Sequence, residues 1–139
     1  MFTTKTAIND CPTDDDYHRV IDLPWKTAIA RIKAALKGAG FSIFGEIDVA
    51  QKLQEKVGLN FNQYLIISVC NPPLAVRALQ EAPDLGALLL CNLEIYEREG
   101  HVEVAEINAT QHFSVGAYPH LEMVIKRENE ILRRVIDSI

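Results

Sequence analysis

Two Cys-Asn pairs are the residues of this sequence whose types could carry chemistry. Cys70-Asn71 ends the apolar run YLIISVC, and Cys91-Asn92 lies inside the run ALLLCNLEIYE. Thiolates act as nucleophiles, redox centres and metal ligands, and an asparagine amide both donates and accepts hydrogen bonds. One interpretation is a thiol-dependent or ligand-binding site. The other is that both thiols are small buried hydrophobic groups.

Local rules account for the first pair more fully than for the second. Asn71 precedes Pro72, and an asparagine cap followed by proline at the first helical position is typical of a helix start. Asn92 instead falls inside a predicted strand, where asparagine is disfavoured. Such a residue answers either to a hydrogen bond within the fold or to a ligand. We therefore place Asn71, Cys91 and Asn92 in a candidate ligand-binding site.

Two carboxylates on the predicted strand FSIFGEIDV form a second candidate group. Strict alternation places Glu46 and Asp48 on one face with Phe44 and leaves Ile47 on the other, with Glu94 as a possible neighbour of the carboxylates. Acid-base catalysis would need one carboxyl kept protonated by burial or by its partner. Since no Ser/His/Asp constellation or glycine-rich phosphate loop accompanies them, we predict ligand binding or a solvated face, and no catalytic residue.

The cysteines and histidines do not form a recognisable metal or disulfide pattern. The three cysteines contain no CxxC pair. With Cys70 paired near Ala87, the Cα atom of Cys91 would lie on the order of 13 Å away, whereas a disulfide needs roughly 7 Å. Another register could bring the two thiols opposite each other. The histidines lack HxH and HxxxH spacing, so a metal site would have to assemble through the fold, for instance from Cys91 and His112.

Composition limits the class of protein and of partner. The 139 residues, 48% of them hydrophobic, fit a single domain with a real core. The formal net charge of −5 argues against nucleic acid as a partner, because phosphate backbones require clustered lysine and arginine. No segment has the length of a secretory signal or of a bilayer span, so we expect a cytoplasmic protein with no membrane partner.

Apolar periodicity predicts an α+β domain over residues 17–139, preceded by a mobile N-terminal tail over residues 1–16. The fold is an antiparallel sheet of about five strands with two long helices on one face, because short turns join the later strands. The expected order is one strand, a helix, four strands with short helical insertions and a last helix. Strands are expected at 18–23, 41–49, 64–70, 87–97 and 102–107, and helices at 24–39, 50–57, 72–81 and beyond Pro119.

Four segments in this order and spacing, GFSIFGEIDV, KVGLNF, CNPPLAVRALQEAPDLG and LLLCNLEIYE, resemble a family known as domain of unknown function 302. The resemblance implies a compact α+β domain with a topology similar to TATA-box-binding-protein-like folds, and often a dimer. The family has no agreed activity, so no catalytic residue is carried over. Family members commonly have Arg-Pro-Tyr-Lys where this chain reads Asn62-Gln63-Tyr64-Leu65, so two positive charges that could bind an anion there are absent. The chain also has Leu90 where proline is common, and His112 where an apolar residue is more usual.

The leading hypothesis is a homodimeric domain that binds a small, partly apolar ligand without catalytic apparatus. Asn71, Cys91 and Asn92 would lie near the polar end of that ligand. The alternative is a thiol-dependent redox sensor, or a metal or haem binder, acting through Cys91 or Cys70. A third possibility is a homodimer that acts by interaction alone, with no ligand.

Overall fold

A computed structural model of the chain describes residues 17–107 and 119–139. Its centre is a five-stranded antiparallel sheet in the spatial order β1-β5-β4-β3-β2. The strands are β1 (Tyr17–Ile21), β2 (Ser42–Asp48), β3 (Tyr64–Cys70), β4 (Cys91–Arg98) and β5 (His101–Glu106). The helices are α2 (Trp25–Gly38), α3 (Val49–Val57), α4 (Pro72–Glu81), the 3-10 helix η1 (Pro83–Leu89) and α6 (Pro119–Asp137). The predicted α+β class and antiparallel sheet are confirmed. The predicted tail, Cys11 and His112 lie outside the described residues.

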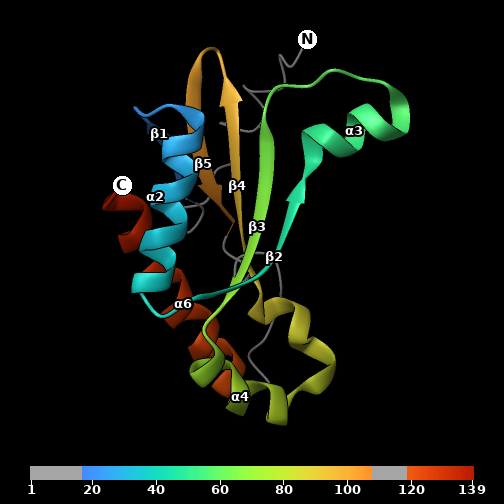
Figure 1. Cartoon of the computed structure of the whole chain (residues 1–139). Helices are drawn as coiled ribbons and strands as arrows, with labels where there is room; N and C mark the ends of the chain where they lie inside the picture. Colours follow the sequence, from blue (N-terminus) through green and yellow to red (C-terminus); the bar gives the residue numbers. More distant parts are fainter. Residues whose placement is uncertain (1–16, 108–118) are drawn as a thin grey trace, which may run out of the picture.

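Helices α2 and α6 cover one face of the sheet, and α4 and η1 lie beyond one end of it (Figure 1). The inner face of α2 is completely buried at Ala28, Ile32 and Leu36, which recur every four residues as the predicted amphipathic stripe requires. These side chains pack with the covered sheet face and with the C-terminal half of α6. None of the described helices is long and apolar enough to cross a bilayer.

The N-terminal half of α6 packs in a second apolar cluster, against α4 and η1. The strand that contains Cys91 begins later than predicted, at Cys91 itself and not at Ala87. Residues from Ala87 to Leu89 belong to η1, which begins at Pro83, and Leu89 is buried in the second cluster. Because an apolar run can fill a core from a 3-10 helix as well as from a strand, composition alone did not separate the two.

A glycine in the left-handed conformation follows the C-terminus of α2. Gly40 has a φ of 92°, and the Phe41 N–H donates to the carbonyl of Leu36 at 3.0 Å, which is the 6→1 bond of a Schellman motif. A Cβ atom at position 40 would also lie 3.4 Å from Nδ2 of Asn71. The turn after α2 therefore packs closely against the start of α4.

The predicted strict alternation of side chains along β2 is wrong, because the strand contains a bulge. Ile43 lies opposite Val69 and Gly45 lies opposite Ser68, so one extra residue, Phe44, interrupts the pairing. Beyond the bulge the two faces exchange. Glu46, predicted to share a face with Phe44, lies opposite Ile67 on the helix-covered face. Phe44 is 59% exposed, and Ile47 is 50% exposed on the other face.

The observed register between β3 and β4 differs from the pairing of Cys70 near Ala87 that was assumed for the distance between the two cysteines. Cys91 lies opposite Val69 of β3. Cys70 therefore directly follows the residue that faces Cys91. Both thiols are nevertheless free, and both are buried. Cys91 belongs to the sheet core and Cys70 to the second apolar cluster.

Candidate functional site

Glu128 is a fully buried carboxyl group in the middle of α6. It lies between the buried residues Ile125 and Leu132, at a position of the helix where an apolar side chain is expected. The sequence analysis did not identify this residue. The available signal was an ionisable residue on the apolar stripe of the last helix.

The contacts of Glu128 join three elements. Its Oε2 atom accepts a hydrogen bond from the backbone N–H of Asn71 at 2.7 Å, at the start of α4. Its Oε1 atom lies 3.8 Å from Sγ of Cys91, the first residue of β4, within reach of a weak S–H···O hydrogen bond. The structure therefore brings together two of the predicted site residues, Asn71 and Cys91, around a carboxyl group.

Burial dominates the electrostatics of this cluster. Desolvation raises the pKa of Glu128 to about 7, although the hydrogen bonds from Asn71 and Cys91 favour its charged form. Burial, and then the charge of Glu128, raise the pKa of Cys70 to about 11 and that of Cys91 further. Since nucleophilic and metal-binding cysteines need a lowered pKa, this geometry gives the thiol-dependent hypothesis no support.

Asn71 has the capping role that its neighbours predict. Its Oδ1 atom accepts from the backbone N–H of Leu74 at 3.3 Å, and Pro72 and Pro73 follow at the first helical positions. Its backbone N–H is held by Glu128. The side-chain oxygen and the backbone N–H of Asn71 therefore both help to fix the position of α4 against α6.

The other three predicted site residues lie apart from this cluster. Asn92 is exposed on the opposite face of the sheet, where Ser68, directly across the strand pair, donates to its Oδ1 atom at 2.5 Å. Glu46 forms an ion pair with Lys33 of α2 at 2.9 Å. Asp48 caps α3 by accepting from the backbone N–H of Gln51 at 2.9 Å.

The predicted neighbour of the carboxylates is also elsewhere. Glu94 lies opposite Ile66, on the sheet face that does not carry Glu46. The bulge in β2 is the physical cause, because it moved Glu46 to the helix-covered face. Glu46 and Asp48 do share a face, as predicted, since they lie opposite Ile67 and Leu65 of β3. Each is engaged separately, Glu46 by Lys33 and Asp48 by the backbone N–H of Gln51.

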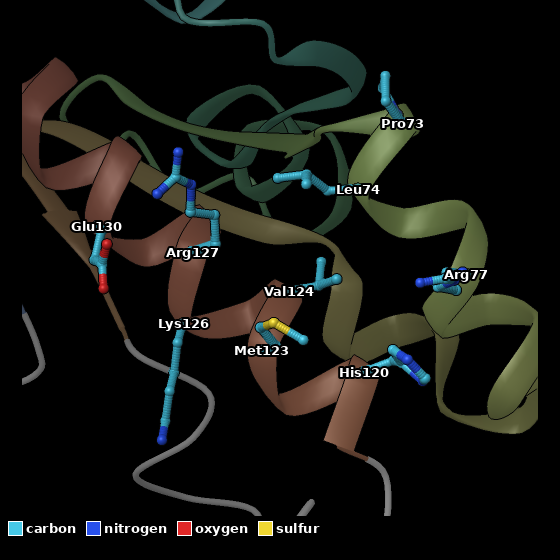
Figure 2. A pocket seen from close by; sticks show the side chains of 9 residues that line it. All are labelled: Pro73, Leu74, Arg77, His120, Met123, Val124, Lys126, Arg127 and Glu130. Atoms are coloured by element: carbon cyan, nitrogen blue, oxygen red, sulfur yellow. The ribbon is translucent and has the colours of Figure 1, made fainter.

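A groove of about 630 Å³ lies between α4 and α6, next to the Glu128 cluster. Figure 2 shows apolar side chains from both helices between two arginines, Arg77 on α4 and Arg127 on α6. The apolar residues that line it are Pro73, Leu74, Met123 and Val124, of which the last three form its floor. The sequence analysis missed this groove, because arginines beside an apolar stripe are common on solvated helices.

The charged groups around the groove differ in their partners. Lys126 pairs with Glu122 at 3.0 Å on the same helix. His120 Nδ1 lies 2.5 Å from Oε2 of Glu81, which closes one end of the groove by joining the N-terminus of α6 to α4. Among the described residues, no ion pair or hydrogen bond engages the guanidinium group of Arg77.

Arg127 is the second cation of the groove without a partner in the described part of the chain. It is exposed, like Arg77, and it follows Lys126 directly in α6. Two guanidinium groups that no other described residue engages, one from each helix, therefore flank the apolar floor (Figure 2).

A second polar cluster lies on the sheet face away from the helices. Glu103 accepts hydrogen bonds from Arg98 at 3.0 and 2.8 Å, and its Oε1 atom lies 2.6 Å from Nε2 of His18. Burial by itself would raise the pKa of Glu103, but the hydrogen bonds from Arg98 and His18 lower it below its usual value. These bonds hold β1, β4 and β5 together and account for the buried carboxylate.

No group of three or more histidine, cysteine, aspartate or glutamate side chains within residues 17–107 and 119–139 is arranged to hold a metal ion. The pair of Cys91 with His112, considered above only as an example of a site assembled by the fold, involves a residue outside those ranges. Cys91 itself uses its thiol in the contact with Glu128.

The family model described as domain of unknown function DUF302 matches residues 17–139. A crystal structure of an uncharacterized conserved DUF302 protein from Bacillus stearothermophilus is similar, with a TM-score of 0.78 and 28% identity, covering 90% of this chain and 98% of that one. The chain therefore belongs to the DUF302 family.

A curated relative is an uncharacterized protein from Aquifex aeolicus (strain VF5), 30% identical over 91 residues. The matched segment is 65% of this chain and only 57% of the Aquifex protein.

Proposed function

We propose that this DUF302 domain is a small-ligand-binding protein without catalytic apparatus, and that the groove between α4 and α6 is its ligand site. The observation that carries the proposal is an apolar floor with polar groups at its borders, in a volume of about 630 Å³. Small-molecule sites typically have volumes of roughly 300–1,000 Å³ and an apolar lining with a few polar groups.

The local structure supports a groove of fixed shape. The cap on Asn71 and its bond to Glu128 set the start of α4, and the Glu81–His120 pair sets its far end against α6. Ala75 and Ala78 of α4 are buried against the second apolar cluster. A site whose walls are held by buried contacts costs less to order when a ligand binds.

The neutral dye Nile red, whose fluorescence rises in apolar surroundings, tests this site without any assumption about ligand charge. We expect saturable binding that Met123→Glu weakens, because it places a carboxylate beside the apolar floor, where Met123 is 60% exposed. Val76→Glu is the matched control, since Val76 is 53% exposed on α4 but does not line the groove. Equal binding by both variants and the original protein would contradict the proposal.

Homodimer formation is the second part of the proposal. The sheet face away from α2 and α6, here called the open face, carries exposed apolar groups at Val20 and Ile47, each 50% exposed. The stacked rings of Tyr64 and Tyr96, with centroids 5.2 Å apart, lie between them on the same face. Aromatic and apolar groups gathered on one surface favour association with a second copy of the chain.

A further inference from the structure

We propose that the ligand of the α4–α6 groove is an amphipathic organic anion, in which a carboxylate or phosphate is attached to an apolar body. This inference rests on the proposed function, because it names the class of molecule that the same groove would bind. It starts from the two arginines whose charges are not engaged elsewhere among the described residues, Arg77 and Arg127.

Among the described residues, the other two basic side chains that line the groove already have acidic partners, so the two arginines are the groups available to a ligand. Lys126 is paired with Glu122, and Figure 2 shows it pointing away from α4. His120 is paired with Glu81. Within the part of the chain that the structure describes, Glu130 is the one acidic residue that lines the groove, and it lies on α6 beyond Arg127 (Figure 2).

The chemistry of the two arginines specifies an oxyanion. A guanidinium group presents its N–H donors in a planar fork that matches a carboxylate or a phosphate. The chain as a whole has a formal net charge of −5, so this cationic border differs from the molecule's average and would attract an anion locally.

The floor of the groove specifies the rest of the ligand. Leu74, Met123 and Val124 offer no hydrogen-bonding side chain other than the weak thioether acceptor of methionine. A free inorganic anion would leave this surface in water. An acyl or alkyl body would cover it, at about 25 cal/mol per Å² of apolar surface removed from water.

The distribution of these residues along the chain is a further argument. One arginine and one floor residue, Leu74, come from α4, and the other arginine comes from α6 with the remaining floor residues. A ligand that engages both sides would therefore bridge two helices whose relative position is held by Asn71 and Glu128.

Three probes with the same apolar chain separate the headgroup from the body: octanoate, octyl phosphate and octan-1-ol. Calorimetric titration should show that at least one of the two anions binds about tenfold or more tightly than the alcohol, because a hydrogen bond to a charged group outweighs a neutral one by this order. The preference should shrink at high salt.

Arginine variants locate the headgroup. Arg77→Gln and Arg127→Gln should each weaken the preferred anion about tenfold and leave octan-1-ol unchanged. Arg134→Gln is the matched control, because Arg134 is exposed on α6 and does not line the groove. An equal loss in all three variants would contradict the inference.

The outcomes also distinguish this inference from the proposed function. If octan-1-ol binds as tightly as both anions, and Met123→Glu still weakens Nile red, the groove is a ligand site but the anionic class is wrong. If none of the three probes binds and Nile red is insensitive to Met123→Glu, both the site and the class are wrong. Binding of octyl phosphate but not octanoate supports the inference and narrows the class to phosphates.

Discussion

At Glu128 a carboxyl group occupies a helix position that packing would fill with an apolar side chain. It is fully buried, and it touches the start of α4 and the first residue of β4. Its neutral form suits this location, because burial penalises the charged form and raises the pKa to about 7. The protonation state of Glu128 is therefore coupled to the packing of α6 against α4 and β4.

The stability of the fold should fall as pH rises through the titration of Glu128. The pKa is raised from the ordinary 4.5 to about 7 in the folded chain, so the stabilisation is fully present below about pH 4.5 and is lost as pH rises through about 7. The full effect is on the order of 3 kcal/mol. Glu128→Gln should remove it, because the amide is neutral at every pH and can still accept from Asn71.

Urea unfolding at pH 5 and at pH 8, for the original chain and for Glu128→Gln, measures this effect. Glu130→Gln is the control, since Glu130 is an exposed carboxylate on the same helix. An identical pH dependence in the original chain and in Glu128→Gln would show that the carboxyl group does not titrate in the predicted window.

The two buried thiols should be slow to react. Burial raises the pKa of Cys70 to about 11 and raises that of Cys91 more, so neither is a thiolate near neutral pH. We expect iodoacetamide at pH 7.5 to modify both residues far more slowly in the folded chain than in urea, as read by peptide mass mapping. Fast modification of Cys91 in the folded chain would instead favour the thiol-dependent alternative.

At the scale of elements, the two side-chain caps should differ in their effect on stability. Asn71 caps α4, which packs in the second apolar cluster, whereas Asp48 caps α3, which has no buried residue. Asn71→Ala should cost about 1 kcal/mol of global stability, as is usual for a cap. Asp48→Ala should leave global unfolding nearly unchanged and speed only the amide exchange of α3.

Urea unfolding combined with hydrogen exchange resolved by residue would measure both effects. A global loss from Asp48→Ala as large as that from Asn71→Ala would mean that α3 contributes to the cooperative core. That result would contradict the structure's placement of α3 outside the buried clusters.

The sequence predicts where the helices and strands lie better than it predicts which face of the sheet each side chain occupies. Amphipathic periodicity predicts α2 and α6, because this signal is local. The bulge at Phe44 was not predictable, since one extra residue in a strand leaves no clear pattern and reverses every side chain after it.

The candidate site was only partly accessible to sequence reasoning for a related reason. Asn71 was identified as a helix cap from its neighbours, and Cys91 was selected with it, but the residue that joins them is Glu128. A polar residue on an apolar stripe is visible in the sequence, whereas its partners depend on how the helix packs. The groove likewise depends on the packing of α4 against α6.

At the scale of the whole molecule, association should depend on the open face. We expect sedimentation velocity at low micromolar concentration to show a dimer that Ile47→Asp weakens, because the change places a charge among exposed apolar groups. Val57→Asp is the control, since Val57 is exposed at the end of α3. A monomer across this concentration range would remove the dimer from the account.

The position of a bound ligand tests directly whether the groove between α4 and α6 is a small-molecule site. Backbone amide chemical shifts can be followed by NMR while the neutral dye Nile red is titrated into the folded chain. We expect the largest shifts to cluster on the two helices that form the groove, at Leu74, Arg77, Met123 and Arg127. Shifts that cluster instead on the open face, around Ser68, Asn92 and Tyr96, or that cluster nowhere, would contradict the proposed site.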